Sequence, residues 1–583
     1  MNITTILTLL GSLALLMFGM KSLSEGLQKM AGPQLRNVLQ KMTSNRVTGM
    51  LTGMFVTAGI QSSTATTLMT VSFVNAGLLT LAQAISVILG AHIGTTLTAW
   101  IMNLGFQSGS GMTTFVYISF FVGIILIYMK KRKNLGDFLF GVGFLFLGLV
   151  TLKATGQDMH LEDNPAVCDF FRNFNDGSVP YPLTILIFLL IGTVLTLCVQ
   201  SSAAIMAITM TLCSTGVLPI NLGIILVLGE NIGTTITSNI AALGANVAAR
   251  RTAFSHFMIN TVGVCWVICV LPFFMRMVCH IAGYDYDLSL SGTPDGDAYA
   301  EANVSKLSVV LATFHSAFNI CNTFIMIWFV PQIEKIVCRV IKPKPQAEDE
   351  DSRLNFISAG LMQTPELSIL NAKKEIGVFA DRCLRMFKLV RELMQTESGD
   401  AFNKLYTRIE KYEGITDNME MEIASYINKV IDGHLSTESK TEIQRMLRVV
   451  SEMESIGDSC YNLARTVSRK RNHTDKDFTE KQYEHINSMF ELDEEALNQM
   501  IVIIKFGEQR YVNVNKSYNI EHEINNYRTQ LKNQNILDIN NQLYDYQIGV
   551  YYMDLISECE KLGDYVINVI ESSGIKEKKA TGF

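Results

Sequence analysis

Hydroxyl and amide side chains interrupt an apolar stretch at residues 61–67, which read QSSTATT. The first three of these residues recur as QSS at 200–202, 139 positions later. Such side chains can donate hydrogen bonds to an oxyanion and can offer oxygen atoms to a hard cation. Because apolar surroundings stabilise a lone charge poorly, we expect a small anion and metal cations to bind there together.

A second motif follows each polar segment at a constant distance. GAHIGTT at 90–96 matches GENIGTT at 229–235, again 139 positions later. Several matches at one ungapped shift indicate an internal repeat. The sequence therefore predicts two related halves, each with one polar break and one G-T-T segment.

Apolar segments of membrane-spanning length surround these motifs. They lie near residues 5–20, 81–105, 113–129, 135–152, 219–245, 254–279 and 306–333. Two longer apolar stretches, about 47–79 and 181–217, are each interrupted by a QSS motif. We expect each of these two stretches to enter and leave the membrane on the same side, as a re-entrant helical hairpin.

The distribution of charge predicts the orientation of these segments. Lys and Arg gather at 21–46, 130–133, 250–251 and 335–344, which places these loops in the cytoplasm. The acidic loops at 154–180 and 281–304 should then face outside. One hairpin would open to the cytoplasm and the other outward, so the two halves would be inverted repeats.

Inverted repeats with broken helices are typical of secondary transporters, which bind substrate where the broken elements meet. The expected membrane transport domain spans residues 1–340, with repeats at about 1–130 and 135–280 and a final helix at 306–333. A channel and an inert duplicated scaffold are the alternatives.

The doubled motif resembles the type II sodium/phosphate cotransporter family over about residues 1–335. In that family the QSS segments lie at the tips of two re-entrant hairpins and take part in binding phosphate and sodium. The resemblance therefore implies a phosphate site made of Gln61, Ser62, Ser63, Gln200, Ser201 and Ser202. The sodium candidates are Thr64, Thr95, Thr96, Asn231, Thr234, Thr235 and Glu230.

The two halves are not identical. Ala203 stands in the second half where the first has Thr64, and His92 stands where the second half has Asn231. His92 either titrates during transport or serves as a neutral hydrogen-bonding group. Glu230 is the one charged residue between 177 and 249, which makes it a candidate cation ligand or proton carrier.

Two further segments, HFMIN at 256–260 and HSAFN at 315–319, place His and Asn four residues apart on one helical face. Packing of polar groups between membrane helices is the expected role of both. The 11 cysteines show no metal-binding spacing, and pairing of Cys168 with Cys279 stays open.

The composition changes after a charged linker at 341–360. Apolar residues recur at helical spacing through 366–396, 401–432 and 437–470, and again in a second set. That second set comprises 477–507, 517–534 and 538–573. We therefore expect a soluble domain at 361–575, built from two three-helix repeats.

The third helix of each set carries a matching acidic motif, ESIGDSCYN at 454–462 and EKLGDYVIN at 560–568. These motifs resemble PhoU, a phosphate-signalling protein of two three-helix repeats in which E-x-x-x-D motifs can hold metal clusters. The resemblance implies a divalent or iron-type metal as a candidate cofactor, and regulation or a partner interface is the alternative role. The candidate ligands are Glu413, Asp417, Glu454, Asp458, Glu560 and Asp564.

The sequence as a whole predicts an all-α, polytopic membrane protein with inverted repeats and a cytoplasmic PhoU-like domain. The 48% hydrophobic and 17% charged composition agrees with a membrane location, which we expect to be the inner membrane. The predicted function is sodium-coupled phosphate transport by alternating access. A phosphate exporter and a membrane phosphate sensor are the alternatives.

The expected partners are inorganic phosphate, sodium and the lipid bilayer, with a second copy of the chain as a further candidate. The sequence has no basic patch with interleaved aromatic residues, so nucleic acid is not expected. It contains no nucleophile–base constellation and no P-loop, so neither an enzyme nor an ATP-driven pump is expected.

Overall fold

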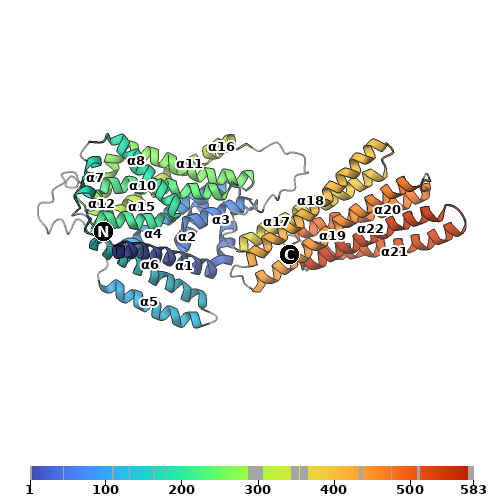
Figure 1. Ribbon diagram of the computed structural model, residues 1–583, viewed down its shortest axis with the longest axis horizontal. Coiled ribbons are helices and arrows are strands. Elements are labelled where there is room, and N and C mark those ends of the chain that lie inside the picture. The colour runs from blue at the N-terminus through green and yellow to red at the C-terminus, as the bar shows by residue number, and fades with distance from the viewer. Residues whose placement is uncertain are drawn as a thin grey trace. The chain divides into compact units, whose positions relative to one another are not determined.

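The chain forms two compact units, Met1–Lys342 and Pro343–Phe583, in this computed structural model (Figure 1). The structure describes residues 3–41, 43, 45–75, 77–107, 110–129, 132–161, 164–175, 178–243, 245–286, 306–342, 354, 357, 365–431, 437–474, 476–507 and 512–575. The side chains of 31–41, 110, 168, 172, 175, 365–367 and 437–438 are outside this description. Most of the predicted 341–360 linker and 281–304 loop, and the Cys168 side chain, therefore lie outside the described residues.

Every regular element in the described part of the first unit is a helix. The first half contains α1 (Ile3–Lys41), α2 (Arg46–Ile60), α3 (Ser63–Asn75), α4 (Leu81–Gln107) and α5 (Ser110–Tyr128). It is followed by α6 (Lys133–Asp158), α7 (Pro165–Asn175), α8 (Tyr181–Val199), α9 (Ser202–Ser214), α10 (Ile220–Ala241), α11 (Val247–Cys269) and α12 (Leu271–Ala282). The last helices are α15 (Leu307–Met326), the 3₁₀ turn η2 (Ile327–Phe329) and α16 (Val330–Val340).

Eight of the described helical segments are long and apolar enough to cross a membrane. Seven of them overlap the seven uninterrupted spans that the sequence predicts, and the eighth is α8. The shorter helices α2, α3 and α9 have 15, 13 and 13 residues. Because a span needs roughly 20 residues, these three are too short to cross the hydrocarbon layer alone.

Glycines allow α2 to pack closely on α4. A Cβ atom added at Gly53 would lie 2.0 Å from the carbonyl oxygen of Val87, and one at Gly90 would lie 1.8 Å from that of Met50. Since real Cβ atoms are not found so near a carbonyl oxygen, only glycine fits at either position. The two helix backbones are therefore in direct contact.

The same contacts recur between α8 and α10. A Cβ atom at Gly192 would lie 2.2 Å from the carbonyl oxygen of Leu226, and one at Gly229 would lie 2.2 Å from that of Leu189. All four residues are displaced by 139 positions from their counterparts between α2 and α4. The internal repeat of the sequence is thus also a repeat of tertiary contacts.

The helices α1 and α6 also approach at glycines. Gly19 of α1 faces the backbone of Leu145, and Gly148 of α6 faces the backbone of Leu16. Residue numbers rise along one helix as they fall along the other, so the pair is antiparallel. Small residues at such crossings give membrane helices the close van der Waals contact that holds them together.

The second unit contains two sets of three long helices (Figure 1). The first set is α17 (Pro365–Met394), α18 (Gly399–Ile431) and α19 (Thr437–His473). The second set is α20 (Glu480–Phe506), α21 (Val514–Asn540) and α22 (Tyr546–Ser573). One apolar core draws residues from all six helices, so the two sets fold as a single body.

Local signals explain where some of these helices begin. Thr479 and Gln482 form a capping box at the start of α20, and the Asn513 side chain accepts from the Lys516 N–H at the start of α21. Both arrangements satisfy backbone donors that the first helical turn leaves free. The six predicted helical segments of this region are all present.

Substitution of Gly90 tests the importance of backbone contact between α2 and α4. We expect Gly90→Ala to destabilise the membrane unit by roughly 1–3 kcal/mol, because the new methyl group overpacks the interface. Gly59→Ala is the matched control, since nothing lies within 4 Å of a Cβ atom there. Thermal unfolding of the detergent-solubilised protein measures both, and equal midpoints for the two variants would contradict this account.

Candidate functional site

The two QSS segments have the same backbone geometry. Gln61 ends α2 in the left-handed conformation at φ 57° and ψ 31°, and Gln200 ends α8 at φ 56° and ψ 26°. Their N–H groups donate to the carbonyl oxygens of Thr57 and Thr196, each at 2.8 Å. A left-handed residue other than glycine is uncommon, and here it reverses the chain so that the next helix starts two residues later.

Serine side chains cap the helices that follow. Ser62 Oγ accepts from the N–H of Ala65, and Ser201 Oγ accepts from the N–H of Ala204, both at 3.2 Å. Each serine therefore keeps its own O–H available as a donor. The first N–H groups of α3 and α9 add further donors, and the positive end of each helix dipole favours a negative charge.

The threonine hydroxyls of the two G-T-T segments differ from the serine caps in their hydrogen bonding. Thr95 Oγ1 donates to the Ala91 carbonyl at 2.8 Å, and its counterpart Thr234 donates to the Glu230 carbonyl at 3.0 Å. A hydroxyl that donates its hydrogen to a carbonyl of its own helix presents only lone pairs to a ligand. These side chains therefore suit a cation better than an anion.

The neighbouring threonines also donate their hydroxyl hydrogens to carbonyls of their own helices. Thr96 Oγ1 donates to the Ile93 carbonyl, and Thr235 Oγ1 donates to the Ile232 carbonyl, both at 2.7 Å. Thr64 of α3 is half-buried beside the first tip. The repeat thus supplies two sets of oxygen atoms of matching geometry, one in each half.

Glu230 and Asn231 distinguish the second half from the first. Glu230 is 2% exposed, and its Oε2 atom has no hydrogen-bond partner. Its counterpart at the same shift is Ala91, which offers no polar atom. A buried carboxylate oxygen without a partner is costly, so a bound cation or a proton would stabilise it.

The structure brings His92 of the first G-T-T motif next to His256 of the HFMIN segment. The rings of His92 in α4 and His256 in α11 lie 5.1 Å apart, and Asn260 Nδ2 lies 3.2 Å from His92 Nε2. The Asn260 amide nitrogen donates to His92 Nε2 when that ring nitrogen carries no proton. Asn260 also donates to the His256 carbonyl within α11, so its contact with His92 adds a polar link between α11 and α4.

Each polar tip is connected mainly to its own half. The Gln61 amide donates to the Ala58 carbonyl and accepts from Thr98 of α4, and Thr57 donates to Thr66 across the hairpin. No hydrogen bond joins the two QSS segments within the described residues. The halves meet instead through helix packing, in which α3 contacts α10 and α9 contacts α4.

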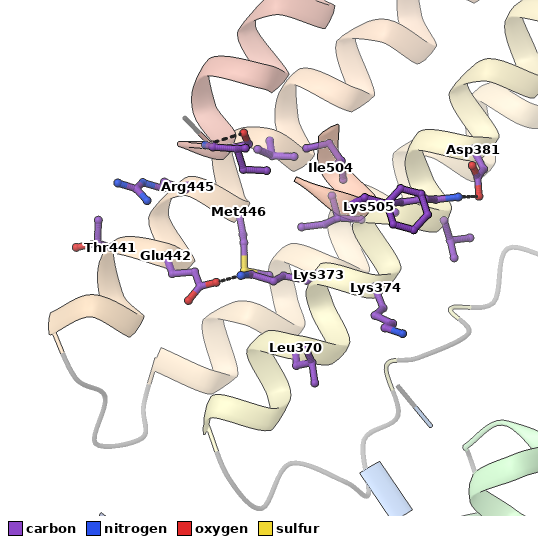
Figure 2. A pocket seen from close by; sticks show the side chains of 17 residues that line it. Leu370, Lys373, Lys374, Asp381, Thr441, Glu442, Arg445, Met446, Ile504 and Lys505 are labelled. Carbon is purple, nitrogen blue, oxygen red and sulfur yellow. Dashed lines mark hydrogen bonds and ion pairs between the residues drawn. The ribbon is translucent and has the colours of Figure 1, made fainter. Parts of the chain in front are cut away.

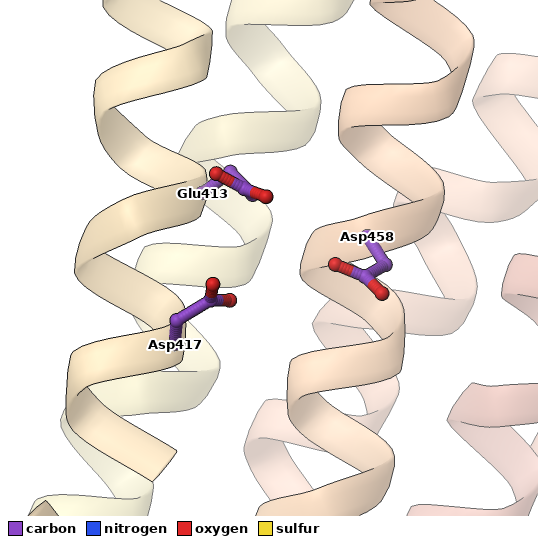
Figure 3. Close-up of side chains that lie close together, drawn as sticks. All are labelled: Glu413, Asp417 and Asp458. Atoms are coloured by element: carbon purple, nitrogen blue, oxygen red, sulfur yellow. The ribbon is translucent and has the colours of Figure 1, made fainter. Parts of the chain in front are cut away.

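In the second unit, three of the predicted acidic residues converge. Oxygen atoms of Glu413, Asp417 and Asp458 all lie within 4.8 Å of one another, from helices α18 and α19 (Figure 3). Asp417 Oδ1 is buried and has no hydrogen-bond partner. Three converging carboxylates match the oxygen ligands that hard divalent cations prefer.

Burial, together with crowding of negative charge, raises the pKa values of carboxyl groups in and beside this acidic cluster. Burial, followed by the charges of Asp458 and Glu420, raises the pKa of Glu454 to about 7. Burial and the neighbouring charge of Asp417 also raise the pKa values of Glu413 and Asp458. A bound divalent cation would offset both the repulsion and the desolvation.

The second three-helix set lacks an equivalent cluster in its described residues. Asp564 stands there in the motif position of Asp458. Burial raises the pKa of Asp564, and the nearby positive charge of Arg528 offsets only part of that rise. An arginine beside the acid disfavours a cation. Arg528 and Glu420 were not predicted from the sequence, because neither belongs to the repeated motif.

Apolar spans, a repeated pair of polar helix breaks and an attached six-helix unit define a polytopic membrane protein of the transporter class. The Na⁺/Pi-cotransporter family matches residues 15–154 and 184–279, and the PhoU domain matches residues 377–467. The chain belongs to this cotransporter family and carries a PhoU domain. The PhoU match covers the helix set that contains the acidic cluster.

Curated relatives agree with this assignment. YjbB of Escherichia coli (strain K12), named as a candidate inorganic phosphate export protein, is 27% identical over 417 residues, which cover 70% of each chain. The uncharacterised protein YqeW of Bacillus subtilis (strain 168) is 30% identical over 282 residues, 46% of this chain and 83% of its own. Human sodium-dependent phosphate transport protein 2B is 38% identical over 107 residues, 18% of this chain and 15% of its own.

Metal binding by the acidic cluster should depend on pH. We expect affinity for Mn²⁺ to rise between about pH 6 and about pH 8, since protons compete for carboxylates whose pKa values are raised. Asp458→Asn should weaken binding at least roughly tenfold, whereas Asp564→Asn in the second set should not. Calorimetry on the full-length protein checks both, and equal affinities for the two variants would reject the site.

Proposed function

We propose that the protein couples the transport of inorganic phosphate to sodium by alternating access, with the phosphate bound between the two QSS tips. The observation that carries this proposal is that, in both halves, the serine hydroxyls remain available as donors while the threonine hydroxyls offer only acceptors. Ser62 and Ser201 keep free O–H donors at helix N-termini, whereas the G-T-T threonines present only acceptors. Donors and acceptors in one apolar unit fit an anion and a cation bound together.

The phosphate would be held by the two serine caps, the adjacent Ser63 and Ser202, and the first N–H groups of α3 and α9. Gln61 and Gln200 would complete the ligand set with their amide groups. Sodium would be held by the threonine oxygens, with Thr64, Asn231 and the unpartnered Glu230 oxygen as further ligands. Neither ion is well stabilised alone in apolar surroundings, which is the physical basis of coupling.

Movement of one half against the other would expose this site to each side in turn. The antiparallel packing of α1 on α6 supports an inverted relation of the halves, because these are the first helices of the two repeats. The short helices α2, α3 and α9 support re-entrant hairpins around the QSS tips. The domain division at about residue 340 and the repeats at 1–130 and 135–280 belong to the same proposal.

The clustered Lys and Arg residues support an orientation with the six-helix unit in the cytoplasm and the other unit in the inner membrane. There the six-helix unit would regulate transport, with the acidic cluster as its metal site. Glu454 stands beside that cluster and would be a further ligand. Glu560 and Asp564 of the second set are less favoured as ligands, since Arg528 supplies a positive charge near Asp564.

Flux measurements test sodium coupling. Proteoliposomes with an inward sodium gradient should take up radiolabelled phosphate, and replacement of sodium by choline should abolish uptake. Phosphate flux that is unaffected by choline would contradict coupling. Saturable phosphate binding without any flux would instead favour a membrane sensor that signals through the six-helix unit.

Export is the second candidate, and it is favoured by the name of the Escherichia coli relative. The same site serves either direction, since net flux follows the gradients of the coupled ions. Flux from preloaded vesicles with the gradient reversed would measure export directly.

Serine substitution tests the anion site. We expect Ser62→Ala to raise the KM for phosphate by roughly tenfold or more, because a hydrogen bond to a charged group contributes about 1.5–3 kcal/mol. The KM for sodium should change less. Ser62→Gly separates binding from folding, because glycine at a helix N-cap costs only a few tenths of a kcal/mol.

Ser119→Ala is the matched control for this prediction. The Ser119 hydroxyl is buried in α5 and donates only to the Phe115 carbonyl at 2.9 Å. It should leave both KM values unchanged. An unchanged phosphate KM in Ser62→Ala and Ser62→Gly would remove Ser62 from the site.

A further inference from the structure

The six-helix unit contains a cavity of about 750 Å³, and none of the candidate metal ligands lines it. The cavity lies where α17, α19 and α20 meet the C-terminal end of α22 (Figure 2). Small-molecule sites in proteins commonly have volumes of about 300–1,000 Å³. The cavity is therefore large enough for a ligand the size of a nucleotide.

The cavity wall is aliphatic and largely buried. Ile376 of α17 and Met446 and Val449 of α19 are each no more than 5% exposed, and Ile504 of α20 adds a further apolar surface. Apolar wall residues of this kind favour burial of an apolar ligand group. An inorganic ion alone would leave this surface without a partner.

Charged side chains surround that apolar wall. Four are cationic, namely Lys373, Lys374, Arg445 and Lys505, and two are acidic, namely Asp381 and Glu442. Two ion pairs, Lys373 with Glu442 and Lys505 with Asp381, hold opposite parts of the cavity (Figure 2). The lining thus has two more positive than negative charges, which favours an anionic ligand.

Burial also acts on one of these cations. Lys374 is half-buried, and desolvation lowers its pKa below the usual value for lysine. An anion bound next to Lys374 would stabilise the ammonium form and reverse that shift. The side chain is therefore in an environment that an anionic ligand would improve.

We propose that this cavity binds an organic phosphate, with its apolar body against the aliphatic wall and its phosphate among the cationic side chains. Such a ligand would contact α17 and α19 of the first helix set and α20 and α22 of the second. Binding would therefore stabilise the packing of one set on the other. A nucleotide and an anionic phospholipid share this chemistry, so the test includes both.

Calorimetry on the full-length protein, held in an amphipathic polymer, tests the proposal. The probes are ATP in the presence of EDTA, dihexanoyl phosphatidylglycerol and, as a matched anion without an apolar body, tripolyphosphate. We expect one of the two organic phosphates to bind one site per chain with a Kd below about 100 µM. Tripolyphosphate should bind at least roughly tenfold more weakly, since it cannot use the aliphatic wall.

Two variants address the site in different ways. Gly377→Leu fills the cavity without a change of charge, since a Cβ atom at Gly377 faces the Lys505 side chain at 3.3 Å. The double variant Lys374→Met, Arg445→Met removes two positive charges and keeps apolar stems. Each should weaken binding at least roughly tenfold, because one blocks apolar burial and the other removes charge-assisted contacts.

Lys516→Met is the matched control, because Lys516 pairs with Glu495 at 2.8 Å and does not line the cavity. It should bind like the unmodified protein. The ligand that binds identifies the source as nucleotide or lipid. Absence of saturable binding by both, equal binding of tripolyphosphate, or equal affinity in Lys516→Met and the cavity variants would overturn the proposal.

Discussion

The membrane unit depends on the cost of leaving backbone polar groups unpaired in an apolar environment. A helix that stops at Gln61 or Gln200 exposes carbonyl groups on one side of the break and N–H groups on the other. The left-handed glutamine and the serine cap satisfy part of this demand in each half. The remaining donors are the feature that makes a polar break suitable for an anion.

Close backbone packing supports the helices that end at these breaks. Gly53 and Gly90 bring α2 against α4, and Gly192 and Gly229 bring α8 against α10 in the same way. Direct backbone contact leaves little space for lipid or water between the paired helices. The scaffold is thus nearly symmetrical, whereas Glu230 and His92 make the chemistry of the two halves different.

The six-helix unit shows the same combination of a repeated scaffold and unequal sites. Three carboxylates converge in the first helix set, while Arg528 supplies a positive charge near the corresponding acid of the second. The shared apolar core holds the two sets together as one body. A cavity where four helices meet gives this body a second surface of distinct, cationic character.

The sequence by itself predicted seven of the eight span-length helices, the six helices of the second unit and the repeat, because these follow from periodicity, segment length and motif spacing along the chain. It also identified Gln61, Ser62 and their counterparts as polar breaks. Only the tertiary structure shows that the Thr95 and Thr234 hydroxyls donate to carbonyls of their own helices, and that Asp417 lies close to Asp458. Those outcomes depend on rotamers and on contacts between distant helices, and such contacts leave no periodic signal in the chain.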